Sequence, residues 1–204
     1  MRLLITRPRH DPPTHYLFYW SETLVKEAQN EGLDVIDLKK EKANKDNFQS
    51  YLKKRPINIV ILNGHGNANS VGGQDNEVII STNDGADLLK GKRVFIRACE
   101  AGLLLGQEII KKGAMGFIGY IQPFIFLTDK NSFHKPLEDK LARPFLECSN
   151  QVALSLIKGN SAEDAHKDSL RKYNENIEKL STSETENSFL LPYLLWNMSS
   201  QVCY

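Results

Sequence analysis

One histidine and one cysteine occupy equivalent places in the sequence. His65 lies in the segment 63–67, Asn-Gly-His-Gly-Asn, directly after an apolar run, and Cys99 lies in the segment 98–102, Ala-Cys-Glu-Ala-Gly, directly after another. A thiol becomes a strong nucleophile when it loses its proton, and a nearby imidazole is suited to accept that proton. The pair therefore predicts nucleophilic catalysis by Cys99 with His65 as its general base.

Glycines flank the histidine on both sides. Gly64 and Gly66 allow the backbone to turn tightly and let the Gly66 amide approach a substrate carbonyl. Together with the amide of Cys99, that amide forms a predicted oxyanion hole.

Two strands must position this pair. The runs 57–62 and 93–97 are nearly continuous in apolar or β-branched residues, which is typical of central parallel strands covered by helices on both faces. Ligands of open α/β sheets bind where the carboxyl ends of such strands meet. We therefore expect His65 and Cys99 to be neighbours in space, although 34 residues separate them in the sequence.

The rest of the chain alternates between short β-rich runs and amphipathic stretches, which indicates βαβ units and five parallel strands. A sixth strand or a loop is expected at 124–127, and a helix interrupted near Pro144 at 137–156. The expected strands are 3–6, 34–38, 57–62, 93–97 and 114–119, and the amphipathic stretches are 16–31, 46–54, 84–90 and 103–112.

The length of 204 residues fits one α/β domain. We expect a core over about 1–160 and a helical C-terminal extension over about 161–204. Ser161 is the expected N-cap of a polar helix, and 181–188 is an expected polar linker, exposed enough to be nicked. The apolar segment 189–196 is expected to dock back onto the domain.

Composition and charge narrow the function classes. Apolar residues make up 41% and charged residues 25%, as in soluble globular proteins. A balance of 26 basic and 25 acidic residues gives a net charge of +1, which supplies no broad field for nucleic acid or anionic lipid. The start of the chain has too short an apolar run for a signal peptide or membrane span, so we expect a cytoplasmic protein.

The other cysteines and histidines show no metal-binding pattern. Three cysteines form no C-x-x-C pair, so neither a disulfide framework nor a zinc site is indicated, and Cys148 and Cys203 are expected to be inert. The remaining histidines are scattered without i, i+4 partners, so we expect no metal and no cofactor. They are His10, His15, His134 and His166.

A hydrophobic block ending in His-Gly, followed by one ending in Ala-Cys, resembles the caspase, legumain, gingipain and clostripain clan of cysteine peptidases over roughly residues 57–120. The segment 97–102 resembles the cysteine segment of legumain and CHAT domains, and 112–120 resembles the following strand of CHAT proteins. The resemblance implies a three-layer α/β/α sandwich around a mostly parallel sheet of about six strands. It also implies peptide-bond hydrolysis through a thioester on Cys99, with a protein or peptide substrate.

The same resemblance suggests residues for substrate binding. Arg97 stands two places before the cysteine, where the clan lines its specificity pocket, and would favour an acidic substrate residue. Asp75, Glu77 and Asp129 would instead favour lysine or arginine, so the preference stays open. Asp75 and Glu100 are candidates both for substrate binding and for the acid that orients His65.

Several alternatives accompany this interpretation. The module could be catalytically inactive and act in protein binding or signalling. A homodimer or a regulatory partner protein is possible with either function. A phosphate-binding loop at 63–73 lacks both G-x-G-x-x-G and G-K-[ST]. A glutamine-amidotransferase site would have its cysteine before its histidine, which is the reverse of the order here.

Overall fold

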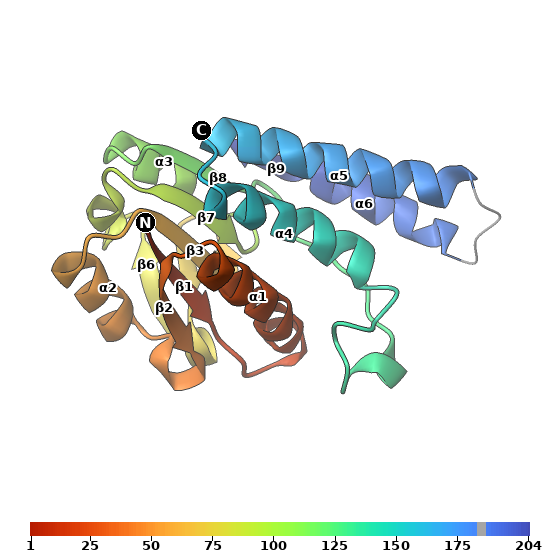
Figure 1. Ribbon diagram of the computed structural model, residues 1–204, viewed down its shortest axis with the longest axis horizontal. Helices are drawn as coiled ribbons and strands as arrows, with labels where there is room; N and C mark the ends of the chain where they lie inside the picture. Colours follow the sequence, from red (N-terminus) through yellow and green to blue (C-terminus); the bar gives the residue numbers. More distant parts are fainter. Residues whose placement is uncertain (183–186) are drawn as a thin grey trace.

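The computed structural model describes residues 1–182 and 187–204 and contains a six-stranded sheet in the order β2-β1-β3-β7-β8-β9 (Figure 1). The first five strands in that order are parallel, as expected, and β9 is antiparallel to β8. The strands are β1 (Arg2–Arg7), β2 (Asp34–Lys39), β3 (Ile59–Asn63), β7 (Arg93–Arg97), β8 (Gly116–Tyr120) and β9 (Gln201–Cys203).

The register of the two central strands sets the level of the predicted site. β3 and β7 pair directly, with Ile59 opposite Arg93 and Asn63 opposite Arg97. Both strands therefore end at the same height. His65 and Cys99 each follow two residues later, at the same edge of the sheet.

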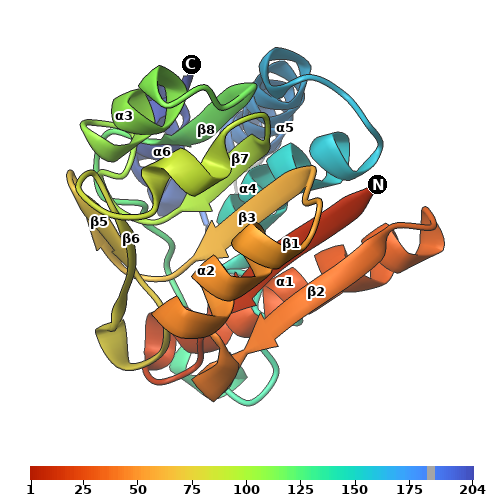
Figure 2. The same cartoon turned by 90° about the vertical axis from the view of Figure 1, so that its left-hand side faces the viewer.

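Helices cover both faces of the sheet, which confirms the three-layer α/β/α arrangement (Figures 1 and 2). Because side chains alternate along a strand, Ile59 and Ile61 of β3 belong to one core cluster and Val60 and Leu62 to the other. The first cluster includes α1 (Pro12–Asn30), α4 (Arg143–Ile157) and the start of α5 (Ala162–Thr182), and the second includes α2 (Lys45–Lys54) and α3 (Leu105–Lys111). Among the described helices, none has the length and apolarity needed to cross a bilayer.

A second, three-stranded antiparallel sheet follows His65 directly and was not expected. It consists of β4 (Gly66–Asn67), β5 (Ser70–Gly72) and β6 (Val78–Ser81). These strands are too short to show a clear alternation of apolar and polar residues. The helix expected at 84–90 is only a 3₁₀ turn at Ala86–Leu89.

An antiparallel strand from the C-terminal part forms one edge of the main sheet. After α5, the helix α6 (Leu191–Ser200) leads into β9, which supplies the sixth strand, whereas residues 124–127 form a loop. Pro144 lies in the first turn of α4 and does not interrupt it, because a helix tolerates proline there.

The sequence predicted an N-cap at Ser161 before α5 and a polar linker at 181–188 after it, and the structure confirms the first but not the second as a separate segment. Ser161 Oγ accepts the Asp164 amide at 3.1 Å, which confirms it as the N-cap of α5. Of the expected linker at 181–188, Ser181 and Thr182 belong to α5, Asn187 and Ser188 begin the turn before α6, and 183–186 lie outside the described residues.

Candidate active site

The cysteine and the histidine line one cavity. It has a volume of about 350 Å³ and opens at the carboxyl ends of β3 and β7, with His65 and Cys99 both in its wall. The first turn of α1 and the loop 124–128 form the remaining sides. The structure therefore brings together the two residues that the sequence predicted for nucleophilic catalysis.

Glycine 66 makes this close approach possible. A Cβ atom added at Gly66 would lie 2.8 Å from the Ala98 Cβ and 2.9 Å from the Cys99 carbonyl oxygen, and both distances are too short for real atoms. The segment carrying His65 therefore packs directly on the segment carrying Cys99. The two residues predicted for the oxyanion hole, Gly66 and Cys99, are in contact.

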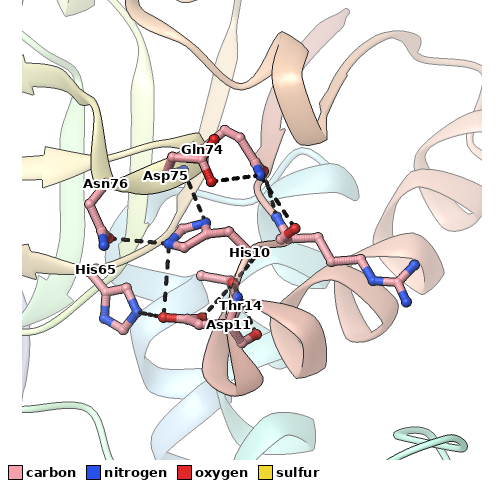
Figure 3. A network of polar contacts seen from close by, with 8 residues as sticks. His10, Asp11, Thr14, His65, Gln74, Asp75 and Asn76 are labelled. Carbon is pink, nitrogen blue, oxygen red and sulfur yellow. Dashed lines mark hydrogen bonds and ion pairs between the residues drawn. The ribbon is translucent and has the colours of Figure 1, made fainter.

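His65 is oriented by a carboxylate that the sequence analysis did not single out. Its Nε2 lies 2.5 Å from Asp11 Oδ2 (Figure 3). The carbonyl oxygen of His65 accepts the Gly72 amide at 2.9 Å. Because the carboxylate accepts the Nε2 proton, Nδ1 keeps the lone pair that a general base needs. Asp11 thus selects the imidazole tautomer that can take a proton from a thiol.

The same carboxylate also begins helix α1. Asp11 Oδ1 accepts the Thr14 amide at 2.9 Å and the Thr14 hydroxyl at 2.6 Å, which makes Asp11 the N-cap of the helix. Burial by itself raises the pKa of Asp11, but the hydrogen bonds from Thr14 and His65 outweigh it and lower that pKa from its ordinary value. Asp11 is therefore ionised at neutral pH, with one oxygen on the helix and one on the imidazole.

The surroundings of Cys99 favour the protonated thiol over the thiolate. Its largest perturbation is burial, which raises the pKa of the thiol, and the nearby Glu100 carboxylate raises it further, while amide hydrogen bonds from Phe124 and Cys99 itself partly offset both. Glu100 has φ of 57°, a left-handed conformation that is uncommon for residues other than glycine. The described residues include no hydrogen bond between the imidazole and Sγ.

This ground state predicts a specific pH dependence for alkylation of Cys99. In a Cys148→Ser, Cys203→Ser background, the rate with iodoacetamide should rise with an inflection above the ordinary thiol value of about 8.5. Glu100→Gln should speed alkylation at pH 7, because removing the negative charge lowers the pKa of the thiol and increases the thiolate fraction. A rate that is high and constant down to pH 6 would instead indicate a preformed thiolate–imidazolium pair.

Arg97 borders the cavity, but its guanidinium points into the core. It is fully buried and donates to Asn63 Oδ1 at 2.7 and 3.0 Å, to Asn150 Oδ1 at 2.6 Å and to Ser21 Oγ at 2.7 Å. Burial lowers the pKa of Arg97 to about 10, which leaves it charged at neutral pH. Its hydrogen bonds are made to neutral oxygens of β3, α4 and α1, so this charge is not presented to an acidic substrate residue.

The acidic residues considered for the site lie elsewhere or act differently. Asp75 donates its amide to His10 Nδ1 at 3.2 Å, and His65 takes Asp11 as its carboxylate partner, not Asp75 or Glu100. Glu77 Oε1 accepts the Lys45 amide, and Asp129 caps a 3₁₀ turn. These residues, Asp75, Glu77, Glu100 and Asp129, are not part of the cavity lining.

One group of side chains has the composition of a metal site. The ligand atoms of His10, Asp11 and His65 lie within 4.8 Å of one another. However, His10 Nδ1 accepts the Asp75 amide, so its Nε2 carries the proton and faces Asn76 Oδ1 at 3.3 Å (Figure 3). A metal-binding imidazole needs the opposite arrangement, with its second nitrogen donating a proton to an acceptor. The cluster fits a hydrogen-bond network better than a cation site.

Two solved structures have a fold similar to that of this chain. The chain is similar to the Arg-specific cysteine proteinase gingipain R, with a TM-score of 0.60 and 11% identity, over 98% of this chain and 45% of that one. It is also similar to the complex of the Porphyromonas gingivalis RgpB pro- and mature domains, with a TM-score of 0.61 and 10% identity, over 98% and 46%. The chain thus spans less than half the length of these proteins. No family model matches the chain, and no curated protein matches it by sequence.

Proposed function

We propose that this chain, which has the caspase-like fold seen in gingipain R, is a cysteine endopeptidase. The observation that carries the proposal is the shared cavity: Cys99 and His65 line it together, and Asp11 holds His65 in the tautomer of a general base. At about 10% identity the likeness to gingipain concerns the fold, so the activity depends on these side chains.

The reaction follows from the placement of these groups. Sγ of Cys99 attacks the substrate carbonyl carbon while His65 Nδ1 takes the thiol proton, and the amides of Gly66 and Cys99 hold the oxyanion. The C–N bond then breaks, and His65 gives its proton to the leaving amine. A water molecule, deprotonated by His65, cleaves the thioester and restores the thiol. Asp11 is a positioning residue throughout.

A second function, peptide binding without turnover, is favoured by the state of the thiol. The raised pKa of Cys99 and the missing hydrogen bond between Sγ and the imidazole are features of an unactivated cysteine. In this case the cavity would still receive a peptide side chain.

A peptide-library experiment separates the two functions. Incubation with the full chain, read by mass spectrometry, should yield new peptide amino termini, and a peptide aldehyde should form a hemithioacetal on Cys99. Prior treatment with iodoacetamide should suppress both. Saturable peptide binding with no cleavage and no adduct would reject the peptidase and support the binding module.

A further inference from the structure

The cavity beside Cys99 is predominantly apolar. Its walls include Leu17 and Pro13 from the first turns of α1, and Phe124, Ile125 and Phe126 from the loop after β8. A volume of about 350 Å³ lies near the lower end of the range of roughly 300–1,000 Å³ for ligand pockets. It suits one large side chain better than a whole metabolite.

Among the described residues, the cavity lining offers no charge that is free to pair with a charged side chain. The ionisable residues of the wall are His65 and Cys99, which belong to the proposed dyad, and Arg97, whose guanidinium is engaged below the pocket. Of the two threonines, Thr14 is engaged with Asp11, and Thr128 is exposed at the surface. A lysine or aspartate side chain would therefore lose its hydration in this cavity without gaining an opposite charge.

The apolar wall is held in place from the C-terminal part of the chain. Asn197 of α6 donates to the Ile125 carbonyl at 2.5 Å and accepts the Ile125 amide at 3.0 Å, and Trp196 Nε1 donates to the Pro123 carbonyl at 2.9 Å. The Phe124 ring packs against Tyr120, with ring centroids 4.7 Å apart. The loop is anchored through its backbone, so the pocket is formed before a substrate arrives.

We propose that this cavity is a specificity pocket for a large apolar side chain, carried by the substrate residue immediately before the scissile bond. The proposal rests on the proposed peptidase function and adds its substrate class. It replaces both charged preferences considered from the sequence, because Arg97 is turned into the core and the candidate acids lie outside the cavity.

The test compares peptide substrates that differ only in charge. Norleucine and lysine have similar chain lengths, and leucine and aspartate have similar branching, so each pair isolates the charge at this position. We expect kcat/KM to be at least about 100-fold higher for the norleucine peptide than for the lysine peptide, and likewise higher for the leucine peptide than for the aspartate peptide. The reason is that an apolar pocket strongly rejects an unpaired charge. Equal or faster cleavage after lysine, arginine or aspartate would overturn the proposal.

Substitution inside the pocket should reverse the preference. Ile125→Asp places a carboxylate in the wall and should raise kcat/KM for lysine peptides at least about 10-fold while lowering it for norleucine peptides. Ile125→Asn is the matched control, since it adds polarity without charge and should lower norleucine cleavage with no gain for lysine. If Ile125→Asp does not fold, Thr128→Asp at the rim should produce the same change in direction. No gain for lysine in a folded acidic variant would count against the pocket.

A binding measurement separates this proposal from the proposed activity. Calorimetry with the Cys99→Ala chain measures the affinity for a peptide ending in norleucine and for a peptide ending in lysine. Neither peptide can react, because the variant has no thiol at position 99. Tighter binding of the norleucine peptide supports the apolar pocket even if the wild-type chain cleaves nothing. Binding without preference overturns the pocket even if the wild-type chain is an active peptidase.

Discussion

Replacing Cys99 with alanine is expected to abolish peptide hydrolysis, with kcat falling by roughly 10⁵- to 10⁶-fold, as when other peptidases lose their nucleophile. The reason is chemical, because the thioester cannot form without Sγ. The measurement is cleavage of a fluorogenic peptide together with labelling by a peptidyl electrophile, and neither should be detectable in the variant.

The matched control for this change is Cys203→Ser. Cys203 is also partly buried, and burial also raises the pKa of its thiol, but it lies on β9 in a different cavity from His65. Its replacement by an amino acid of nearly the same size should leave kcat/KM within about 2-fold, because Cys203 does not line the cavity that contains His65 and Cys99. Activity that survives Cys99→Ala, or that disappears in Cys203→Ser, would contradict the assignment of Cys99 as the nucleophile.

The second large effect is expected at Asp11. Asp11→Asn should lower kcat by about 10²- to 10⁴-fold, by analogy with the loss when a catalytic triad loses its carboxylate. An amide NH₂ facing Nε2 favours the tautomer with its proton on Nδ1, and that tautomer has no lone pair for the thiol proton. KM should change little, because Asp11 orients the base and is absent from the cavity lining.

Asparagine is the informative replacement because it preserves the helix cap. Asn is as good an N-cap as Asp, so the free energy of unfolding at pH 7 should change by less than about 1 kcal/mol. The pH dependence of kcat/KM distinguishes a role in positioning His65 from a purely structural role. The acidic limb of this profile should shift in Asp11→Asn, whereas the loss of a helix cap alone would leave it unchanged. Loss of activity in proportion to loss of stability, with an unchanged pH profile, would reduce Asp11 to a capping residue.

The acid sensitivity of stability follows from the same carboxylate. The folded-state pKa of Asp11 is lower than its ordinary value of about 3.9, so its ionised form stabilises the fold above that value. This contribution decreases as pH falls through the folded pKa. The wild-type and Asp11→Asn chains should therefore differ most in the slope of stability against pH below about pH 4.

The sequence sufficed to predict the parallel sheet and the shared edge at which His65 and Cys99 lie, because strong apolar runs mark the two central strands. Ile59–Asn63 and Arg93–Arg97 are buried strands, and their pairing in register places His65 and Cys99 at the same edge. Short strands without such runs were missed. Gly66–Asn67 pairs with Ser70–Gly72, which in turn pairs with β6, and the composition of these two short strands does not indicate that pairing.

Asp11 was missed for a different physical reason. Nothing in the segment 9–13 indicates that a carboxylate would face a histidine 54 residues away. A local signal did exist, since Asp before Pro-Pro with Thr at the third following place is an N-cap pattern at the end of a strand. The direction of Arg97 could not be predicted either, because it depends on oxygens from three other elements.

The anchoring of the 124–128 loop by α6 has a consequence for the order of events during synthesis. Translation produces His65 and Cys99 well before Asn197, whose side chain holds both backbone groups of Ile125. A growing chain therefore contains both residues of the proposed dyad before it contains the side chain that anchors the apolar wall of the cavity. The apolar wall of the cavity is therefore supported only once α6 has been synthesised and has docked, so peptide recognition by the proposed pocket depends on α6.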